Sequence, residues 1–136
     1  MKFIAAALFS AAVVSADAIY SVTDFNAGCI PHSVECSYSF SVVHVNNGEF
    51  VPVNCTASAV SDNTLPAVTG TCEESSRTFV IARNSTGLTL TVTQPVSVVS
   101  YESGSHFIPK DEITTKSDQV ATLEIYDGPT AFTLFD

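Results

Sequence analysis

The sequence predicts an all-β fold: a single small antiparallel β-barrel or sandwich of about eight or more short strands, stapled by two disulfides. Three observations favour this class. The chain has 136 residues, which is room for one domain. Apolar and hydroxyl side chains alternate along most of it, and no stretch shows a convincing helical period. It also contains four cysteines, the even number that two crosslinks require.

Alternating side chains mark the individual strands. The clearest is residues 88–93, where Leu88, Leu90 and Val92 alternate with threonines. Residues 37–45 alternate aromatic or apolar side chains with serines in the same way. Weaker alternation predicts strands at residues 19–25, 50–57, 78–83, 96–101, 120–126 and 130–135. Turn signals rich in Asn, Gly and Ser separate these segments, as an antiparallel barrel or sandwich requires.

Two stretches interrupt the alternation. Residues 58–71 contain Asp62, Asn63, Pro66 and Gly70. Residues 102–118 contain no cysteine and hold both lysines of the domain, Lys110 and Lys116. A segment of this length without regular structure is often functional. The alternative is a short helical turn near residues 111–116 that covers one end of the barrel.

A secretory signal peptide is predicted over residues 1–18. Lys2 supplies its positive start, residues 3–14 are apolar except for Ser10, and small residues follow. The apolar run is shorter than the roughly 20 residues of a membrane-spanning helix. Cleavage after Ala16 and cleavage after Ala18 both fit, and we favour Ala18. The remaining domain, residues 19–136, is therefore expected to be secreted and extracellular.

The charge balance excludes two classes of partner. Lys and Arg number 5 against 14 Asp and Glu, which gives a formal net charge of −9. Proteins that bind nucleic acid use Lys and Arg to neutralise phosphates. Docking on anionic lipid likewise needs a basic cluster. We expect neither a nucleic acid nor a membrane as a partner.

The four cysteines, Cys29, Cys36, Cys55 and Cys72, predict two disulfides in a secreted chain. Three pairings are possible, and pairing of nearest neighbours would close two short loops. Two disulfides leave no thiol for a covalent dimer, and the oligomeric state stays open. No C-x2-C spacing occurs and the histidines are scattered, so we expect no metal site and no cofactor.

No established catalytic motif is present, and we expect no catalytic residues. The adjacent acidic pairs at 73–74 and 111–112 would point to opposite faces of an extended chain, so neither forms a ready carboxylate dyad. His44 shares a strand face with apolar residues, which places it at the core margin. His106 is the histidine worth testing as a base. The rival classes are a small secreted hydrolase and a barrel that carries a small apolar ligand.

Two N-glycosylation sequons occur, at Asn54 and Asn84. Asn84 lies in a predicted hairpin turn, where a glycan would be solvated. Asn54 precedes Cys55, which is expected to be bonded and buried. Asn84 is therefore the stronger candidate.

The first part of the domain resembles a family of fungal secreted proteins, the relatives of the major Alternaria allergen. Residues 19–27 are similar to the family's opening strand, which ends in an acidic residue followed by Phe, here Asp24 and Phe25. Residues 37–42 resemble its second strand. Further similarity covers residues 53–58, Cys72, residues 79–81 and residues 87–92, and it fades beyond Pro95.

The resemblance implies a β-barrel, secretion, and pairing of Cys55 with Cys72, which leaves Cys29 with Cys36. It also implies that the protein binds an extracellular plant-host protein, as an effector or elicitor of plant defence, and that it is a candidate allergen. Further cysteines in the second half of the founding allergen have no counterpart here.

Residues 102–118 are the predicted interaction segment. Binding hot spots favour aromatic and charged side chains that lose water together. Outside the predicted strands, this segment concentrates such groups, including His106, Phe107, Ile108 and Lys110. The alternative is that Phe107 and Ile108 plug the barrel end and serve stability alone.

Overall fold

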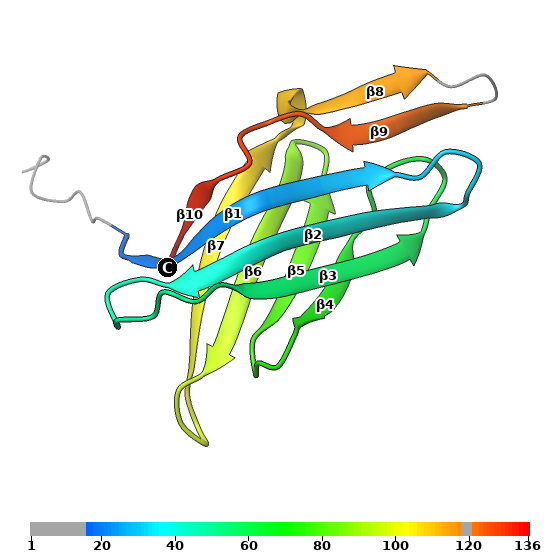
Figure 1. Ribbon diagram of the computed structural model, residues 1–136. Coiled ribbons are helices and arrows are strands. Elements are labelled where there is room, and N and C mark those ends of the chain that lie inside the picture. Colours follow the sequence, from blue (N-terminus) through cyan, green and yellow to red (C-terminus); the bar gives the residue numbers. More distant parts are fainter. Residues whose placement is uncertain (1–15, 118–120) are drawn as a thin grey trace, which may run out of the picture.

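Residues 16–117 and 121–136, which the computed structural model describes, form ten β-strands and one short 3₁₀ helix (Figure 1). The strands are β1 (Ala18–Cys29), β2 (Glu35–His44), β3 (Val53–Val60), β4 (Val68–Cys72), β5 (Thr78–Asn84), β6 (Gly87–Pro95), β7 (Tyr101–Pro109), β8 (Ile113–Ser117), β9 (Thr122–Tyr126) and β10 (Phe132–Phe135). The helix η1 (Lys110–Glu112) lies between β7 and β8. The predicted signal peptide, apart from its last three residues, lies outside the described residues.

Eight of the strands close into an antiparallel barrel. Strands β1 to β7 are neighbours in chain order, and β10 pairs with both β7 and β1, which closes the sheet. Strands β8 and β9 form a hairpin that joins the sheet at β1, where Gly28 pairs with Ile125. The all-β, antiparallel barrel predicted from the alternation is confirmed.

The barrel interior is filled by the apolar side chains of the alternating strands. Leu88, Leu90 and Val92 of β6 are buried, while the threonines between them are partly exposed. Aromatic rings meet across the interior, with the ring centroids of Phe40 and Phe79 4.9 Å apart. Eight strands enclose a space just wide enough for such side chains.

The turns between strands define two opposite ends of the barrel. We call one the hairpin end, formed by residues 45–52, 73–77 and 96–100 together with Asp17 and Asp136. The other is the cleft end, formed by residues 30–34, 61–67, 85–86 and 127–131, helix η1 and the β8–β9 hairpin. In Figure 1 the β6–β7 turn is the lowest point of the hairpin end, and the β8–β9 hairpin is the top of the cleft end.

Both disulfides implied by the family resemblance are present. Cys29 is bonded to Cys36, and Cys55 is bonded to Cys72. Each bond joins two residues that face each other across neighbouring strands. The Cys29–Cys36 bond lies at the cleft end, and the Cys55–Cys72 bond lies toward the hairpin end. No free cysteine remains.

The irregular segment predicted at residues 58–71 is shorter than expected. Strand β3 continues to Val60 and β4 begins at Val68, so residues 61–67 alone lie between strands. The alternating pattern of β4 is not recognisable in the sequence, because Gly70 occupies an inward-facing position that an apolar side chain would otherwise fill. A Cβ atom at Gly70 would lie 2.5 Å from the ring of Phe79, so the packed aromatic ring requires the glycine.

The prediction for the next region is also wrong. Residues 96–100, predicted within a strand at 96–101, form the β6–β7 turn. The predicted irregular segment 102–118 contains most of β7, then η1 and β8, and its last residue lies outside the described residues. Gly104 breaks the apolar pattern of β7, because a Cβ atom there would lie 3.0 Å from Leu134 and 3.1 Å from Tyr20.

Candidate interaction surface

The four residues predicted to contribute to the interaction segment lie in different environments. Ile108 is fully buried in the barrel core, whereas Phe107, its neighbour on β7, is about half exposed. The ring of His106 stacks on Phe132 with centroids 4.0 Å apart, and burial lowers the pKa of His106. Lys110 is exposed in η1. The core-plug alternative therefore holds for Ile108, while a binding role for the other three residues stays a prediction.

The hairpin end exposes a group of large apolar side chains. We call Phe50, Val51, Val96, Val98, Val99 and Tyr101 the apolar tip. Val98 is 98% exposed and Val99 is 86% exposed, values close to those of a free chain. Phe50 and Val51 belong to the β2–β3 loop and the other four to the β6–β7 turn or its end, so the tip consists of two loops at the same end of the barrel. Single exposed apolar residues are ordinary, but several within one short turn, as in the β6–β7 turn, are typical of a contact surface.

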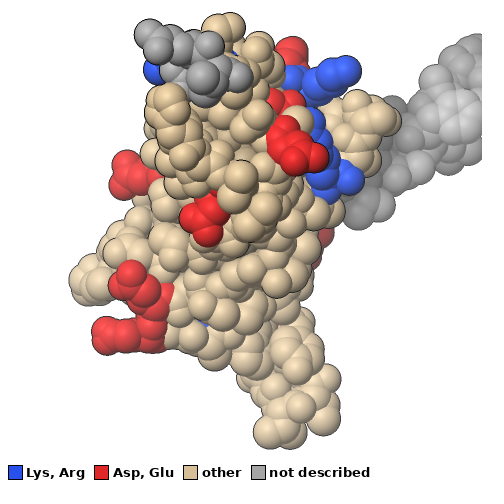
Figure 2. Space-filling view, turned by 90° about the vertical axis from the view of Figure 1, so that its right-hand side faces the viewer, with Lys and Arg blue, Asp and Glu red and all other residues tan. Residues whose placement is uncertain are grey.

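Hydroxyl groups inside the β6–β7 turn explain why its valines point outward. The Ser97 and Ser100 hydroxyls are hydrogen-bonded to each other at 2.8 Å, and the Val99 amide donates to Ser97 Oγ. The Val96 amide donates to the Ser100 carbonyl oxygen. The polar groups of the turn are thus used within it, and the apolar side chains face solvent. Figure 2 shows this turn as the lowest lobe of the molecule, without charged side chains.

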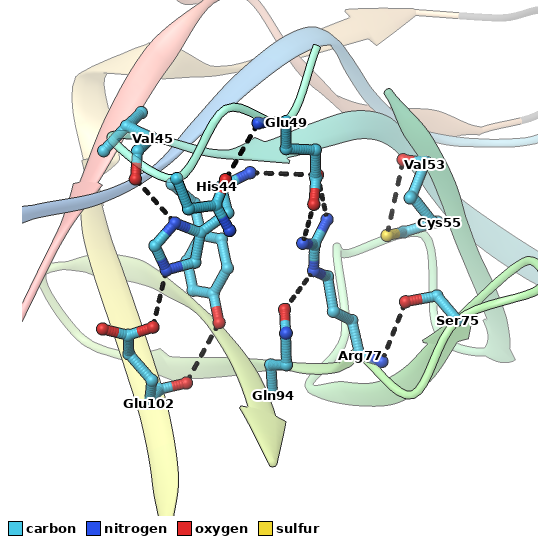
Figure 3. A network of polar contacts seen from close by, with 11 residues as sticks. His44, Val45, Glu49, Val53, Cys55, Ser75, Arg77, Gln94 and Glu102 are labelled. Carbon is cyan, nitrogen blue, oxygen red and sulfur yellow. Dashed lines mark hydrogen bonds and ion pairs between the residues drawn. The ribbon is translucent and has the colours of Figure 1, made fainter. Parts of the chain in front are cut away.

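A buried arginine at the hairpin end joins several strands and loops (Figure 3). Arg77 is 4% exposed, and its two terminal nitrogens donate to the Glu49 carboxylate at 2.7 and 2.6 Å. Its Nε donates to Gln94 Oε1 at 2.6 Å, and its guanidinium lies 5.5 Å from the centroid of the Tyr20 ring. The Arg77 hydrogen bonds lower the pKa of Glu49. The guanidinium therefore ties the β2–β3 loop to β6 and β1.

A histidine and a carboxylate form a second contact beside Arg77. His44 Nε2 lies 2.6 Å from Glu102 Oε1, and His44 Nδ1 lies 2.6 Å from the Val45 carbonyl oxygen. Figure 3 shows the imidazole held between these two oxygens. Tyr20 donates its hydroxyl to the Glu102 carbonyl oxygen, and burial raises the pKa of Tyr20 to about 12. Both imidazole nitrogens are engaged within the protein, which is the arrangement of a structural histidine.

The cleft end holds a second arginine–glutamate pair and an open cavity. Arg83 donates to both carboxylate oxygens of Glu124 and to the Leu65 carbonyl oxygen. A cavity of about 460 Å³ is lined by Arg83, Asn84, Lys110, Ile113, Thr115 and Glu124, among others. Its lining mixes both signs of charge and contains no aromatic ring, so it has the character of a hydrated surface cleft.

Both sequon asparagines are exposed. Asn84 lies at the β5–β6 turn, where its Oδ1 accepts hydrogen bonds from the amide and hydroxyl of Thr86. Asn54 lies within β3, and its Oδ1 is 2.8 Å from Ser41 Oγ. A glycan at Asn84 would rise from a turn at the rim of the cleft, whereas one at Asn54 would rise from the middle of a sheet. The preference for Asn84 stays a prediction.

The described residues contain no group of three or more His, Cys, Asp or Glu side chains that could hold a metal ion. Within the same residues, no helix is long and apolar enough to span a bilayer. The chain matches no protein-family model, no curated protein and no solved structure.

Proposed function

We propose that the protein is a secreted binding protein that contacts an extracellular plant-host protein through the apolar tip, and so acts as an effector or elicitor of plant defence. The carrying observation is the apolar tip itself, with Val98 and Val99 almost fully exposed. The sheet between the ends of the barrel presents mainly Ser and Thr to solvent, which offer little binding energy. The resemblance of residues 19–95 to fungal secreted proteins supports the host–microbe setting.

Two features favour binding over the rival classes. The two arginines and His44, which could serve a catalytic site, are bound to neighbouring groups that hold the fold together. The barrel interior, where a small apolar cargo would lie, is occupied by aromatic and aliphatic side chains such as Tyr38, Phe40 and Phe79.

The test compares two matched pairs of exposed valines. In the first variant Val98→Ser is combined with Val99→Ser at the hairpin end. In the control, Val34→Ser is combined with Val60→Ser at the cleft end. These two residues are neighbours there, because the amide of Ser61, next to Val60, donates to the Val34 carbonyl oxygen. All four side chains are exposed, so both variants should keep the wild-type Tm.

Purified proteins are infiltrated into leaf tissue, and the induction or suppression of defence markers is measured. We expect the wild type and the cleft-end control to change the response, and the hairpin-end variant to lose the effect. A hairpin-end variant as active as the wild type would contradict the proposal. A third variant, Phe107→Ser, tests whether the exposed part of β7 contributes instead.

A further inference from the structure

Acidic side chains share the hairpin end with the apolar tip. Glu49 directly precedes Phe50, and Glu102 directly follows Tyr101, so two apolar anchors each have a carboxylate beside them in the chain. The other side-chain carboxylates at the hairpin end of the predicted domain, residues 19–136, belong to Glu73, Glu74 and Asp136, and all three are exposed. A molecule that approaches this end therefore meets several negative charges, which together we call the acidic group.

Among the described residues, the arginine of this end pairs with Glu49 and does not offset the exposed carboxylates of the acidic group. Arg77 is the basic residue at the hairpin end among the described residues, and it is 4% exposed. Its guanidinium is used by Glu49, Gln94 and the face of Tyr20. The other basic residues that the structure describes, Arg83, Lys110 and Lys116, belong to the cleft end, and Figure 2 shows Lys and Arg in the upper part of the molecule.

We infer that the apolar tip binds a basic protein, one with an apolar pocket rimmed by Lys and Arg side chains. This inference rests on the proposed function and adds the chemistry of its partner. Apolar side chains at the centre of a contact supply most of the affinity, while complementary charges at the rim speed association and exclude wrong partners. The apolar tip supplies the first of these features and the acidic group at the same end supplies the second.

The same charges disfavour two other occupants. In a symmetric dimer through the tip, the acidic groups of the two copies would face each other, and the repulsion between like charges would oppose the contact. At an anionic membrane, the headgroups would repel the carboxylates instead of attracting a basic cluster. Both occupants become measured outcomes of the experiment.

Two charge variants separate the partner's chemistry from the role of the tip. Glu73→Gln with Glu74→Gln removes two exposed charges from the hairpin end and leaves the contacts of Arg77 with Glu49 and Gln94 in place. Glu35→Gln with Asp62→Asn removes two exposed charges from the cleft end and serves as the control. The probe is extracellular leaf fluid, separated by cation exchange into a retained basic fraction and an unretained fraction, each immobilised on a sensor surface.

We expect the wild type to bind the basic fraction, with a rate that falls as salt rises. The hairpin-end charge variant should associate roughly threefold to tenfold more slowly at low salt, and the cleft-end control should match the wild type. Loss of binding in the Val98→Ser, Val99→Ser variant would confirm that the tip is the contact. Binding that prefers the unretained fraction, or that ignores both salt and the hairpin-end charges, would overturn the basic partner.

Each failure has its own signature. If the tip variant loses binding while charge and salt have no effect, the proposed function stands and the basic partner is wrong. If the tip variant binds like the wild type, the proposed function itself fails. Sedimentation of the wild type with vesicles that contain phosphatidylserine, or a dimer in analytical ultracentrifugation that the tip variant lacks, would overturn the inference in favour of a membrane or a second copy.

Discussion

The two ends of the barrel use the same kinds of crosslink with different strength. Each end has one disulfide and one arginine–glutamate pair; Arg77 directly precedes β5 and Arg83 lies near the other end of that strand. At the hairpin end the disulfide closes 17 residues of chain and the Arg77 side chain is 4% exposed. At the cleft end the disulfide closes 7 residues and the Arg83 side chain is 33% exposed.

This difference in crosslinking accounts for the apolar surface that the hairpin end exposes. Exposed valines and an exposed phenylalanine add nothing to folding, so the end that carries them needs stabilisation from elsewhere. The buried Arg77 network supplies this stabilisation. Arg77, the residue before β5, links the β2–β3 loop to the end of β6. A tip held in one conformation loses less entropy on binding, which favours affinity.

The largest expected difference between the ends concerns the two arginines. Arg77→Met would leave the Glu49 carboxylate without its partner at the hairpin end, and we expect a loss of about 3 kcal/mol in the free energy of unfolding. Arg83→Met breaks a pair whose arginine is partly hydrated, and we expect a loss of about 1 kcal/mol. Urea unfolding of both variants measures the difference.

A double variant identifies the origin of the Arg77 effect. Combining Arg77→Met with Glu49→Gln removes the unpaired charge, so part of the lost stability should return. Equal losses for Arg77→Met and Arg83→Met would contradict the distinction drawn between the two ends.

The second comparison concerns the disulfides. In the chain-entropy account, a disulfide that closes a loop of 17 residues stabilises the folded state more than one that closes a loop of 7 residues, by about 0.8 kcal/mol. Both bonds have one almost fully buried cysteine, Cys55 or Cys36, so the hydroxyl that serine places in the core costs both variants alike and the loop length decides the order. We therefore expect the Cys55→Ser, Cys72→Ser variant to melt several degrees below the Cys29→Ser, Cys36→Ser variant. The opposite order in calorimetry would show that the shorter crosslink matters more.

The sequence was sufficient for the parts of the barrel with strict alternation. Strand β6 is predictable because each of its inward positions carries an aliphatic side chain, namely Leu88, Leu90 and Val92. It was insufficient where the inward position is a glycine. Gly70 in β4 and Gly104 in β7 leave room for Phe79 and Tyr20, which come from other strands. The alternation of side chains within one strand gives no information about an aromatic ring from another strand that fills the space beside a glycine.

The candidate site was harder to predict than the fold for a related reason. Val96, Val98 and Val99 have high strand propensity, so local composition predicted a strand, whereas cross-strand pairing ends at Pro95 and Tyr101. Pro95 was the available signal, since proline commonly marks the end of a strand. The contacts of Arg77 with Glu49 and of His44 with Glu102 join residues far apart in the chain. No spacing rule within the sequence indicates either contact.

The smallest expected effect is a difference in pH dependence between the Arg77 network and the middle of β7. At the hairpin end the Arg77 hydrogen bonds lower the pKa of Glu49 from 4.5, so its stabilisation is complete above pH 4.5 and is lost as the pH falls through the folded-state value. On β7, burial lowers the pKa of His106 from 6.5, so the unfolded chain takes up the proton first. The contribution of His106 to the free energy of unfolding is therefore fully present above pH 6.5 and decreases as the pH falls below that value.

The two windows can be separated by one substitution. His106→Gln removes the titrating group next to Phe132 and should flatten the dependence of Tm on pH between about pH 5 and 7, a change of a few degrees at most. The steeper fall below pH 4.5 should remain, because Glu49 is unchanged. Tm values from scanning fluorimetry at half-unit pH steps would test this. An unaltered slope between pH 5 and 7 in the variant would mean that His106 is equally accessible to protons in the folded and unfolded chain.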